Sequence, residues 1–284
     1  MSSEMIGAVG ALWRYPVKSM GGENLHEALV VSGGIIGDRA YALIDPTNGK
    51  VASAKHPRKW EKLLELSASY VESPDSSAPT PPVRISLSNG TATGSDQSGC
   101  DASLSEELDR AVILTTARPE SISLERVDPL LGEESILDTG GLMMEGRFSD
   151  YAAIHLLTTA TLAQLSVLDP ESRFDVKRFR PNILVESAED EAGFMENAWV
   201  GRTIAIGDQV RLRVTDPTPR CSIPTLGQGD LNKDPRILRT IATHNTVAVP
   251  AVDGERFPCA GAYAFVIQGG TVRTSDTVRI ESID

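Results

Sequence analysis

A cysteine beside an arginine, in a segment stiffened by proline, is the residue of this sequence best suited to chemistry. Cys221 follows Arg220 in DPTPRCSIPTL, residues 216–226, which holds three prolines. The neighbouring cation favours the thiolate, which is the form of cysteine that binds soft metals or attacks electrophiles. The alternative is a small apolar residue packed in a turn, the commoner role of a lone cysteine.

A basic segment is the second candidate. In RFDVKRFRPN, residues 173–182, four basic side chains stand against Asp175, so the local charge is 4 − 1 = +3 in a chain of formal net charge −12. The planar guanidinium of arginine suits phosphate, so the segment predicts an anion site. Its members are Arg173, Lys177, Arg178 and Arg180. A solvated loop with surface ion pairs explains the composition equally well.

Two shorter motifs could add contacts to the same anion. Lys18 and Ser19, in WRYPVKSMGG, precede two glycines, where an ammonium and a hydroxyl can bind a phosphate or a pterin. In the turn Gly37-Asp38-Arg39, the carboxylate of Asp38 could orient Arg39. A solvated lysine and an ordinary surface ion pair are the alternatives.

The remaining histidines and cysteines carry weaker signals. His155 is expected at the beginning of a helix over 156–168, where a capping or core role is commoner than metal ligation, and His56 in an exposed turn. Cys259 is expected to pack in the core, and Cys100 to be incidental. With four scattered histidines and no CxxC pair, neither a histidine-based metal site nor a cysteine-based zinc site is expected.

Composition limits the class of protein. The 284 residues are 40% hydrophobic and 23% charged, as in ordinary globular proteins, and the acidity disfavours nucleic acid and membrane partners. No segment approaches the roughly 18 apolar residues of a membrane span, and the N-terminus lacks the early basic residues of a signal peptide. Three sparse cysteines suit a reducing compartment. We therefore expect a soluble cytoplasmic protein of one or two domains.

The first third of the chain predicts short strands separated by glycine and proline turns, which is typical of a small barrel or a bent sheet. The expected strands cover 6–13, 28–31, 40–44, 64–71 and 83–87. The proline-rich segment 73–82 is either an interdomain linker or a long hairpin loop, and the strand pattern that resumes at Val83 favours the loop. A brief helix is expected over 103–108, with Ser103 as its N-cap.

A second, mostly β unit is expected from about residue 150. Its predicted strands cover 182–185, 204–206, 210–214, 263–267 and 272–280. One helix is expected over 158–168, and another begins after Asp234 with Pro235 at its first position and stops at Asn245. The sequence contains neither a GxGxxG nor a GxxxxGK[ST] phosphate-binding loop.

These segments, in this order, resemble the MOSC family, named for the C-terminal domain of molybdenum cofactor sulfurase. IGAVGALWRYPVKSMGGENL and GGIIGDRAYALID are similar to the start of the associated N-terminal β-barrel domain. IHLLTTATLAQL, KRFRPNILVE, GDQVRLRVTDPTPRCSIPTL and AFVIQGGTVRTSDTVRI are similar to the MOSC core. The resemblance implies a mostly β fold with a few short helices: a MOSC β-barrel over 116–284, packed against a small N-terminal β-barrel-like domain over 1–115.

The resemblance also implies a molybdenum–molybdopterin cofactor, which we expect in the cleft between these domains because both contribute residues to it. It makes Cys221 the catalytic residue and the protein's ligand to molybdenum. The expected cofactor-binding residues are Lys18, Ser19, Arg39, His155, Arg180, Pro181, Asn182 and Arg220. The protein would orient this cofactor, which supplies the two-electron chemistry.

The activity implied by the resemblance is that of a molybdenum-dependent oxidoreductase. Two-domain members of the family, the amidoxime-reducing components of mitochondria and their bacterial relatives, reduce small N-hydroxylated or N-oxide substrates. The sequence has no CxxxxCxxC-type iron–sulfur motif, so a separate haem or iron–sulfur protein is expected to deliver electrons. It also lacks the N-terminal membrane anchor of the mitochondrial relatives, in keeping with a cytoplasmic protein.

Two alternatives stay open. In the first, the chain is a cofactor carrier or a sulfur-handling protein in which Cys221 carries a persulfide, because MOSC-type domains also occur joined to sulfurases. That association carries pyridoxal phosphate binding with it, but no pyridoxal-phosphate domain is expected here, so cysteine desulfuration would need a partner. In the second, the chain binds some other anion and Cys221 is structural.

Overall fold

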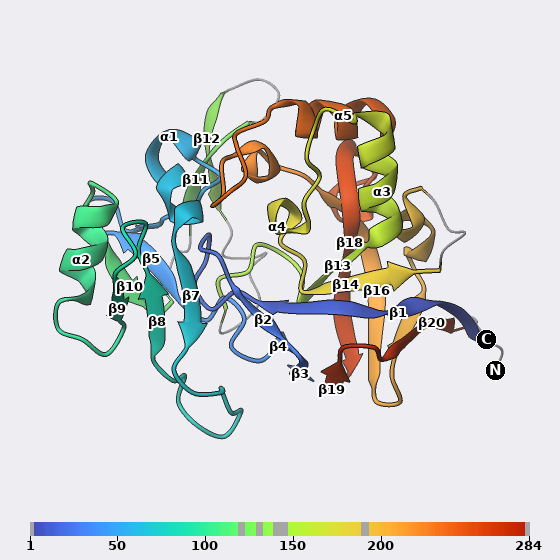
Figure 1. Ribbon diagram of the computed structural model, residues 1–284, viewed down its shortest axis with the longest axis horizontal. Helices are drawn as coiled ribbons and strands as arrows, with labels where there is room; N and C mark the ends of the chain where they lie inside the picture. The colour runs from blue at the N-terminus through green and yellow to red at the C-terminus, as the bar shows by residue number, and fades with distance from the viewer. Residues whose placement is uncertain (1–2, 119–122, 129–132, 139–146, 189–192, 282–284) are drawn as a thin grey trace.

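Strands dominate the architecture. The computed structural model describes residues 3–118, 123–128, 133–138, 147–188 and 193–281. These residues form two neighbouring β-rich regions and a few short α-helices, which confirms the predicted fold class (Figure 1). None of the helices in the described part of the chain combines the length and apolar character needed to cross a membrane.

Seven strands among the described residues close into a barrel. Around the ring they are β13 (Ile154–Thr158), β14 (Ile183–Ser187), β1 (Ser3–Arg14), β20 (Thr277–Glu281), β15 (Thr203–Ile206), β16 (Val210–Pro219) and β18 (Arg256–Gln268). The ring closes where β18 pairs with β13, with Ile154 opposite Ala264. The β13–β14 pair is parallel and the other neighbours are antiparallel. The short strands β2 (Glu23–Leu25) and β17 (Thr246–Ala248) extend β1 and β18.

The barrel core follows from side-chain alternation along its strands. In β16, Val210, Leu212 and Val214 are buried, whereas Arg211 and Arg213 between them are not. Successive side chains of a strand point to opposite faces, so this pattern directs one apolar row inward. Trp199, which is also fully buried, packs in the same cluster. Burial of these apolar side chains is the main term that holds the barrel closed.

Three small sheets lie outside the barrel ring; the first packs on the barrel core through Val30, Ile35 and Val272, and the other two belong to the region beside the barrel. They are β3 (Glu27–Val31) with β4 (Gly34–Ile35) and β19 (Gly270–Arg273), then β5 (Ala42–Asp45) with β6 (Lys50–Val51) and β10 (Ile113–Thr115), and β7 (Ser67–Tyr70) with β8 (Val83–Ser86) and β9 (Ala92–Gly94). The helices α1 (Pro57–Trp60) and α2 (Cys100–Glu107) pack on a core that includes Met20, Leu63 and Leu104. A hairpin of β11 (Ser123–Val127) and β12 (Glu134–Asp138) pairs beside α1.

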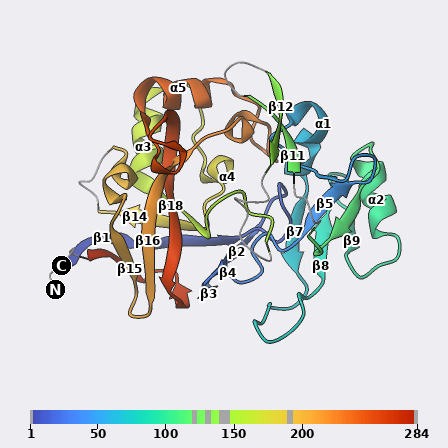
Figure 2. The same cartoon turned by 180° about the vertical axis from the view of Figure 1, so that it is seen from behind.

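The longer helices cover one side of the barrel, as both views show (Figures 1 and 2). The helix α3 (Thr159–Leu168) begins where the Thr158 hydroxyl accepts a hydrogen bond from the Thr161 amide at 3.0 Å. The helix α5 (Arg236–His244) ends before Asn245, as predicted, but it begins one residue later than predicted, because Pro235 is its N-cap rather than its first residue. The short helix α4 (Val176–Phe179) lies to one side of them, and its Phe179 packs with Ile237 and Leu165 in one apolar cluster (Figure 1).

Most predicted elements are confirmed, with shifted ends. Residues 73–82 connect β7 to β8, which pair as an antiparallel hairpin, so the loop interpretation is correct. Segment 272–280 forms two strands, β19 and β20, rather than one, and the start of 64–71 belongs to a 3₁₀ turn at Glu61–Glu65. The predicted N-cap of α2 was wrong, because the helix begins after Gly99 and Ser103 lies within it.

Three expectations about single residues were also wrong. His155 lies in β13, not at the beginning of a helix, and His56 is buried rather than exposed. Cys100 is not incidental, because it is the first residue of α2 and is buried in the core on which that helix packs. Cys259 is fully buried in β18, as expected for a packing residue.

The two regions share strands. The beginning of the chain contributes β1 to the barrel. Near the end of the chain, β19 pairs with β3. Ser3, at the start of β1, pairs with Glu281, at the end of β20, so the two ends of the described chain lie side by side (Figure 1). The division of the chain at about residue 115 stays a prediction.

Candidate active site

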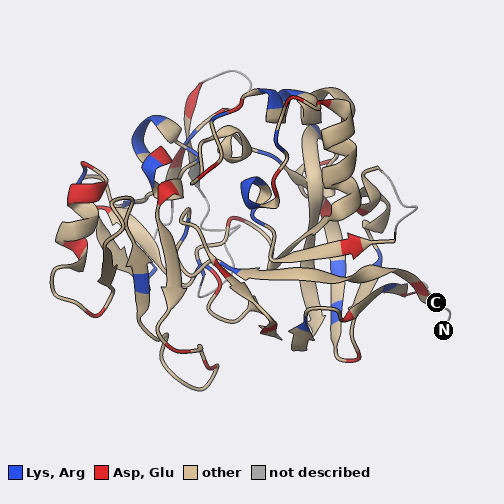
Figure 3. Cartoon of the chain, in the orientation of Figure 1, with Lys and Arg blue, Asp and Glu red and all other residues tan. Residues whose placement is uncertain are grey.

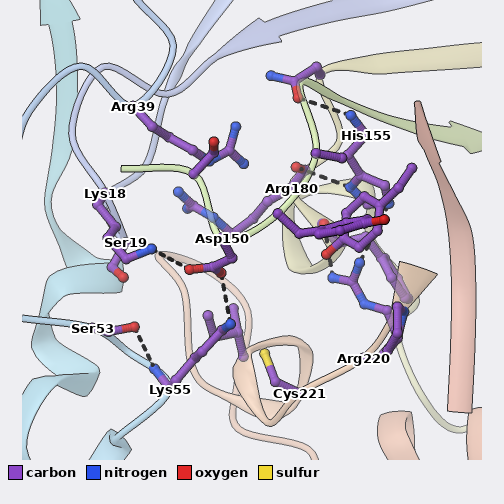
Figure 4. A pocket seen from close by; sticks show the side chains of 18 residues that line it. Lys18, Ser19, Arg39, Ser53, Lys55, Asp150, His155, Arg180, Arg220 and Cys221 are labelled. Carbon is purple, nitrogen blue, oxygen red and sulfur yellow. Dashed lines mark hydrogen bonds and ion pairs between the residues drawn. The ribbon is translucent and has the colours of Figure 1, made fainter. Parts of the chain in front are cut away.

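One pocket gathers the chemically capable residues from both regions (Figure 4). Lys18, Ser19, Arg39 and Lys55 come from the first region. His155, Arg180, Arg220 and Cys221 come from the barrel and the segments that follow its strands. The remaining lining residues are Ser53, Ser149, Asp150, Tyr151, Ala152, Phe179, Asn182, Pro219, Ile223 and Tyr263.

Cys221 lies in the turn between β16 and a short 3₁₀ helix at Ile223–Thr225. The strand is longer than predicted and reaches Pro219, and the amide of Arg220 donates to the Pro258 carbonyl at 2.8 Å. This bond fixes the backbone next to the cysteine. Cys221 is half-buried, so its side chain is accessible from the pocket.

The buried guanidinium of Arg178 holds the segment that follows Cys221. Its Nη1 donates to the carbonyls of Pro224 and Leu226 at 3.0 and 3.1 Å, and its Nη2 donates to that of Asn232 at 2.8 Å. A guanidinium presents several donors in a rigid plane, so one side chain can satisfy several carbonyls of an irregular loop. Arg178 is therefore a structural residue rather than part of an anion site.

Two arginines of the pocket lie on the faces of one tyrosine ring. The guanidinium carbons of Arg39 and Arg180 lie 4.8 and 4.3 Å from the ring centre of Tyr15. The Tyr15 hydroxyl donates a hydrogen bond to the Pro181 carbonyl at 3.1 Å. The backbone amide of Tyr15 donates to the buried carboxylate of Asp38, and this carboxylate also pairs with Arg39. The ring's negative faces reduce the repulsion between two like charges.

The backbone is constrained at the same residues. Ser19, Arg39 and Arg180 have φ values of 66°, 52° and 55°, in the left-handed region. Non-glycine residues adopt this region at a cost, and such residues concentrate at functional sites. Burial lowers the pKa of Arg180 to about 10, although Tyr15 opposes the shift. Arg180 is thus still cationic at neutral pH.

A carboxylate joins two lysines on the opposite wall. Asp150 Oδ1 and Oδ2 lie 2.5 and 2.9 Å from the Nζ atoms of Lys18 and Lys55, and Lys18 also donates to the Phe148 carbonyl at 2.9 Å. Burial acts to raise the pKa of Asp150, but the two ammonium groups prevail and hold it well below its usual range. Burial lowers the pKa of Lys18. Asp150 is therefore an anion at neutral pH.

His155 is a neutral imidazole that supports Arg220. Burial, and then the charge of Arg220, hold the pKa of His155 well below its ordinary value. Its Nδ1 lies 3.4 Å from the Arg180 carbonyl and its Nε2 lies 3.5 Å from Arg220 Nη1. These partners assign the proton to Nδ1 and leave Nε2 facing the guanidinium. Arg220 also donates to the Phe179 carbonyl at 2.9 Å.

The pocket is strongly cationic although the chain is acidic. Among the described residues that line it, five side chains are cationic and one, Asp150, is anionic. Figure 3 shows further basic residues on α1 and α4, the helices next to Lys55 and Arg180 in the sequence. The Oγ of Ser149 and the Nε of Arg220 are buried without a hydrogen-bond partner. Such a site is complementary to a polyanionic ligand rich in acceptors.

The structure brings together most of the residues singled out in the sequence. Cys221, Lys18, Ser19, Arg39, His155, Arg180, Asn182 and Arg220 all line the pocket. Pro181 is not among the lining residues; its carbonyl holds Tyr15. The amide of Asn182 accepts from His155 N at 3.1 Å and donates to the Trp13 carbonyl at 3.3 Å, so it also ties β13 to β1. The contacts of these residues with a cofactor stay predictions.

The basic segment 173–182 does not form one site. Arg173 and Lys177 are exposed and pair with Asp230, and Arg178 binds backbone carbonyls. Of its four basic side chains, only that of Arg180 lines the pocket. Local charge overestimated the cluster because a short helix, α4, points its successive side chains in different directions.

Among the lining residues that sequence reasoning missed, four have side chains suited to binding a ligand: Lys55, Asp150, Tyr151 and Tyr263. Lys55 stands beside His56, and Asp150 precedes the β13 strand, where no motif marked them. A carboxylate just before the apolar segment 151–157 was the available signal. No three His, Cys, Asp or Glu side chains gather as a metal site would require within the described residues, so any metal here would depend on Cys221 and non-protein ligands.

Comparisons with known proteins identify the family. The MOSC domain model matches residues 144–279, and the model of the MOSC N-terminal beta barrel domain matches residues 6–92. The chain therefore belongs to the MOSC family.

Curated relatives cover nearly the whole chain. The mitochondrial amidoxime reducing component 2 of Rattus norvegicus is 25% identical over 97% of this chain and 83% of its own length. The mitochondrial amidoxime-reducing component 1 of Mus musculus is 26% identical over 97% of this chain and 82% of its own length. Among solved structures, YiiM from Geobacillus stearothermophilus aligns with 46% of this chain and 55% of its own, at 14% identity and a TM-score of 0.34.

Proposed function

We propose that this protein binds a molybdenum–molybdopterin cofactor and reduces small N-hydroxylated or N-oxide compounds with electrons from a separate haem or iron–sulfur protein. The observation that carries the proposal is a half-buried cysteine in a pocket whose lining includes five cationic side chains and one carboxylate. Family membership and the amidoxime-reducing relatives support the same reading.

The residues fit such a cofactor. Thiolate sulfur is a good ligand for a soft metal, and Cys221 is the cysteine that the pocket contains. The paired guanidinium groups of Arg39 and Arg180 suit a phosphate, and the unpartnered donors of Ser149 and Arg220 suit heterocycle acceptors. Nothing in the lining supplies a competing set of protein ligands among the described residues.

The protein's own share of the reaction is positioning. When bound, the cofactor supplies two-electron transfer to the substrate. Cys221 would hold the metal, Arg39 and Arg180 would neutralise the phosphate, and His155 would keep Arg220 directed at the pocket. Lys18, Asp150 and Lys55 would keep the wall of the pocket that they form charged, and their ion pairs would leave none of the three as an unpaired buried charge.

Turnover tests the activity directly. Protein from a molybdenum-replete host is mixed with a reduced viologen dye and an amidoxime, and dye oxidation is followed. The control variant is Cys100→Ala, because Cys100 lies in the core and outside the pocket. The wild type and this control should oxidise the dye only when substrate is present. The rate of Cys221→Ser should be at least about a hundredfold lower, as is typical when a group that binds the reacting centre is lost.

The same assay separates the alternatives. A fully loaded wild type that reduces no hydroxylamine, amidoxime or N-oxide would contradict the reductase and favour a cofactor carrier or persulfide protein. Activity that survives in Cys221→Ser would favour a structural role for that cysteine.

A further inference from the structure

Tyr263 lines the pocket, and its hydroxyl has no hydrogen-bond partner among the residues that the structure describes. Tyr263 lies in β18, opposite His155 in the neighbouring strand β13, and its side chain lines the pocket together with Cys221. This side chain is half-buried. A phenol is protonated at neutral pH and can both donate and accept, so this group has free capacity toward a ligand.

The hydroxyls of the other tyrosines at the site already donate hydrogen bonds to protein acceptors. The Tyr15 hydroxyl donates to the Pro181 carbonyl at 3.1 Å, and the Tyr151 hydroxyl donates to the buried carboxylate of Asp216 at 2.9 Å. Structural tyrosines that are this far from bulk water normally find such a partner. The difference marks Tyr263 as the tyrosine available to a molecule in the pocket.

The ring of Tyr263 is held in place by its neighbours. Its centre lies 5.6 Å from that of Tyr151 and 5.8 Å from that of His155, with the planes inclined at 58° and 64°. Edge-to-face contacts of this kind are favourable, and they restrict the side chain to one position. The hydroxyl is therefore presented at a fixed point, which is the condition for a hydrogen bond that orients a reactant.

Tyr263 shares the pocket with the proposed metal ligand. Its side chain and that of Cys221 line the same pocket, and Tyr263 lies in β18, which pairs with the β16 strand that precedes Cys221. A small substrate would have to enter this pocket to react near a metal held by Cys221.

We propose that Tyr263 is a substrate-binding residue whose hydroxyl donates a hydrogen bond to the oxygen of the N-hydroxyl group. This inference rests on the proposed function. The overall conversion is R–NHOH + 2e⁻ + 2H⁺ → R–NH₂ + H₂O, in which the N–O bond breaks, N–H and O–H bonds form, and the separate electron donor is oxidised. A donor at that oxygen favours its departure, while the two protons come from solvent.

The variant Tyr263→Phe tests the role, because it keeps the ring contacts and removes only the hydroxyl. Tyr41→Phe is the matched control, since the Tyr41 hydroxyl donates to the Pro81 carbonyl away from the pocket. Dissociation constants for the amidoxime are measured by calorimetry without reductant, and kcat/KM is measured with reduced viologen. Molybdenum content and melting temperature are measured on the same samples.

We expect Tyr263→Phe to weaken amidoxime binding by about threefold to tenfold, which is the effect of losing one hydrogen bond. The same variant should lower kcat/KM by about tenfold or more, while its molybdenum content stays unchanged. Tyr41→Phe should match the wild type. Equal binding and kcat/KM in Tyr263→Phe and wild type would overturn this inference and leave the proposed function standing. A loaded wild type that neither binds nor reduces the amidoxime would overturn both.

Discussion

At the scale of single residues, the pocket places like charges together without leaving them unsupported. Arg39 and Arg180 share the ring of Tyr15, and Lys18 and Lys55 share the carboxylate of Asp150. The shared ring and the shared carboxylate hold these four cationic side chains in position before any ligand binds. Affinity for an anion then depends less on ordering side chains at the moment of binding.

The tyrosine between the arginines can be tested by stability. Tyr15→Leu removes both cation–π contacts and a buried ring, and we expect the free energy of unfolding to fall by about 3–5 kcal/mol. Tyr15→Phe keeps the ring and loses only the hydrogen bond to Pro181, so about 1 kcal/mol should be lost. Urea denaturation measures both. Equal losses in the two variants would show that the ring does not stabilise the arginines.

At the scale of elements, the site depends on where strands end and cross. Cys221 follows the end of β16, His155 lies in β13, and Tyr263 lies in β18 between them. Strand β18 comes very close to His155 at Gly261, where φ is +88°. A Cβ atom there would lie 2.4 Å from His155 Nε2 and 2.5 Å from the Leu156 carbonyl oxygen.

Gly261→Ala should therefore disturb the site and the barrel together. The positive φ and the clash with backbone predict a loss of at least about 2 kcal/mol in stability, measured by thermal or urea unfolding. Because His155 must move, Arg220 loses its neighbour and bound molybdenum should fall as well. Gly90→Ala serves as control, since its φ is also positive but no atom lies within 4 Å of the added Cβ. If the two variants lose the same stability, the close approach at Gly261 does not matter.

At the scale of the whole molecule, the first strand completes the barrel. In the ring, β1 pairs with β14 on one side and with β20 on the other. A fragment that begins at residue 116 lacks β1, so β14 and β20 each keep an unpaired edge, and the barrel core loses Ile6, Val9 and Leu12. We expect this fragment to aggregate or to lack a cooperative melting transition, as followed by circular dichroism and size-exclusion chromatography.

Adding β1 back gives the matched control. The same fragment with residues 1–14 joined through a flexible linker should recover cooperative melting in part, because the ring can then close. A monomeric 116–284 fragment that melts cooperatively would contradict the structural role assigned to β1.

The sequence predicted the local pieces of this molecule better than their arrangement. Alternation of apolar and polar residues identified β16, and Asp234-Pro235 identified the start of α5, because both signals arise from neighbouring residues. The participation of β1 in the barrel depends on pairing across about 170 residues, which periodicity does not encode.

The site shows the same limit. The residue types at Lys18, Arg180 and Cys221, together with the family resemblance, predicted members of one pocket. Asp150 and Tyr263 gained their positions from tertiary packing, without a local motif. His155 was assigned to a helix because its apolar neighbours fit a helical spacing, whereas the pairing of β13 with both β14 and β18 made that segment a strand.

The central claim is that Cys221 binds the metal of a molybdenum–pterin cofactor, and metal analysis tests it most directly. Molybdenum by elemental analysis and pterin by fluorescence after oxidation are measured on wild type, Cys221→Ser and Cys100→Ala from a molybdenum-replete host. We expect near-stoichiometric molybdenum and pterin in the wild type and in Cys100→Ala, with molybdenum markedly reduced in Cys221→Ser. Wild-type protein that contains neither, although the host is replete, would contradict the claim.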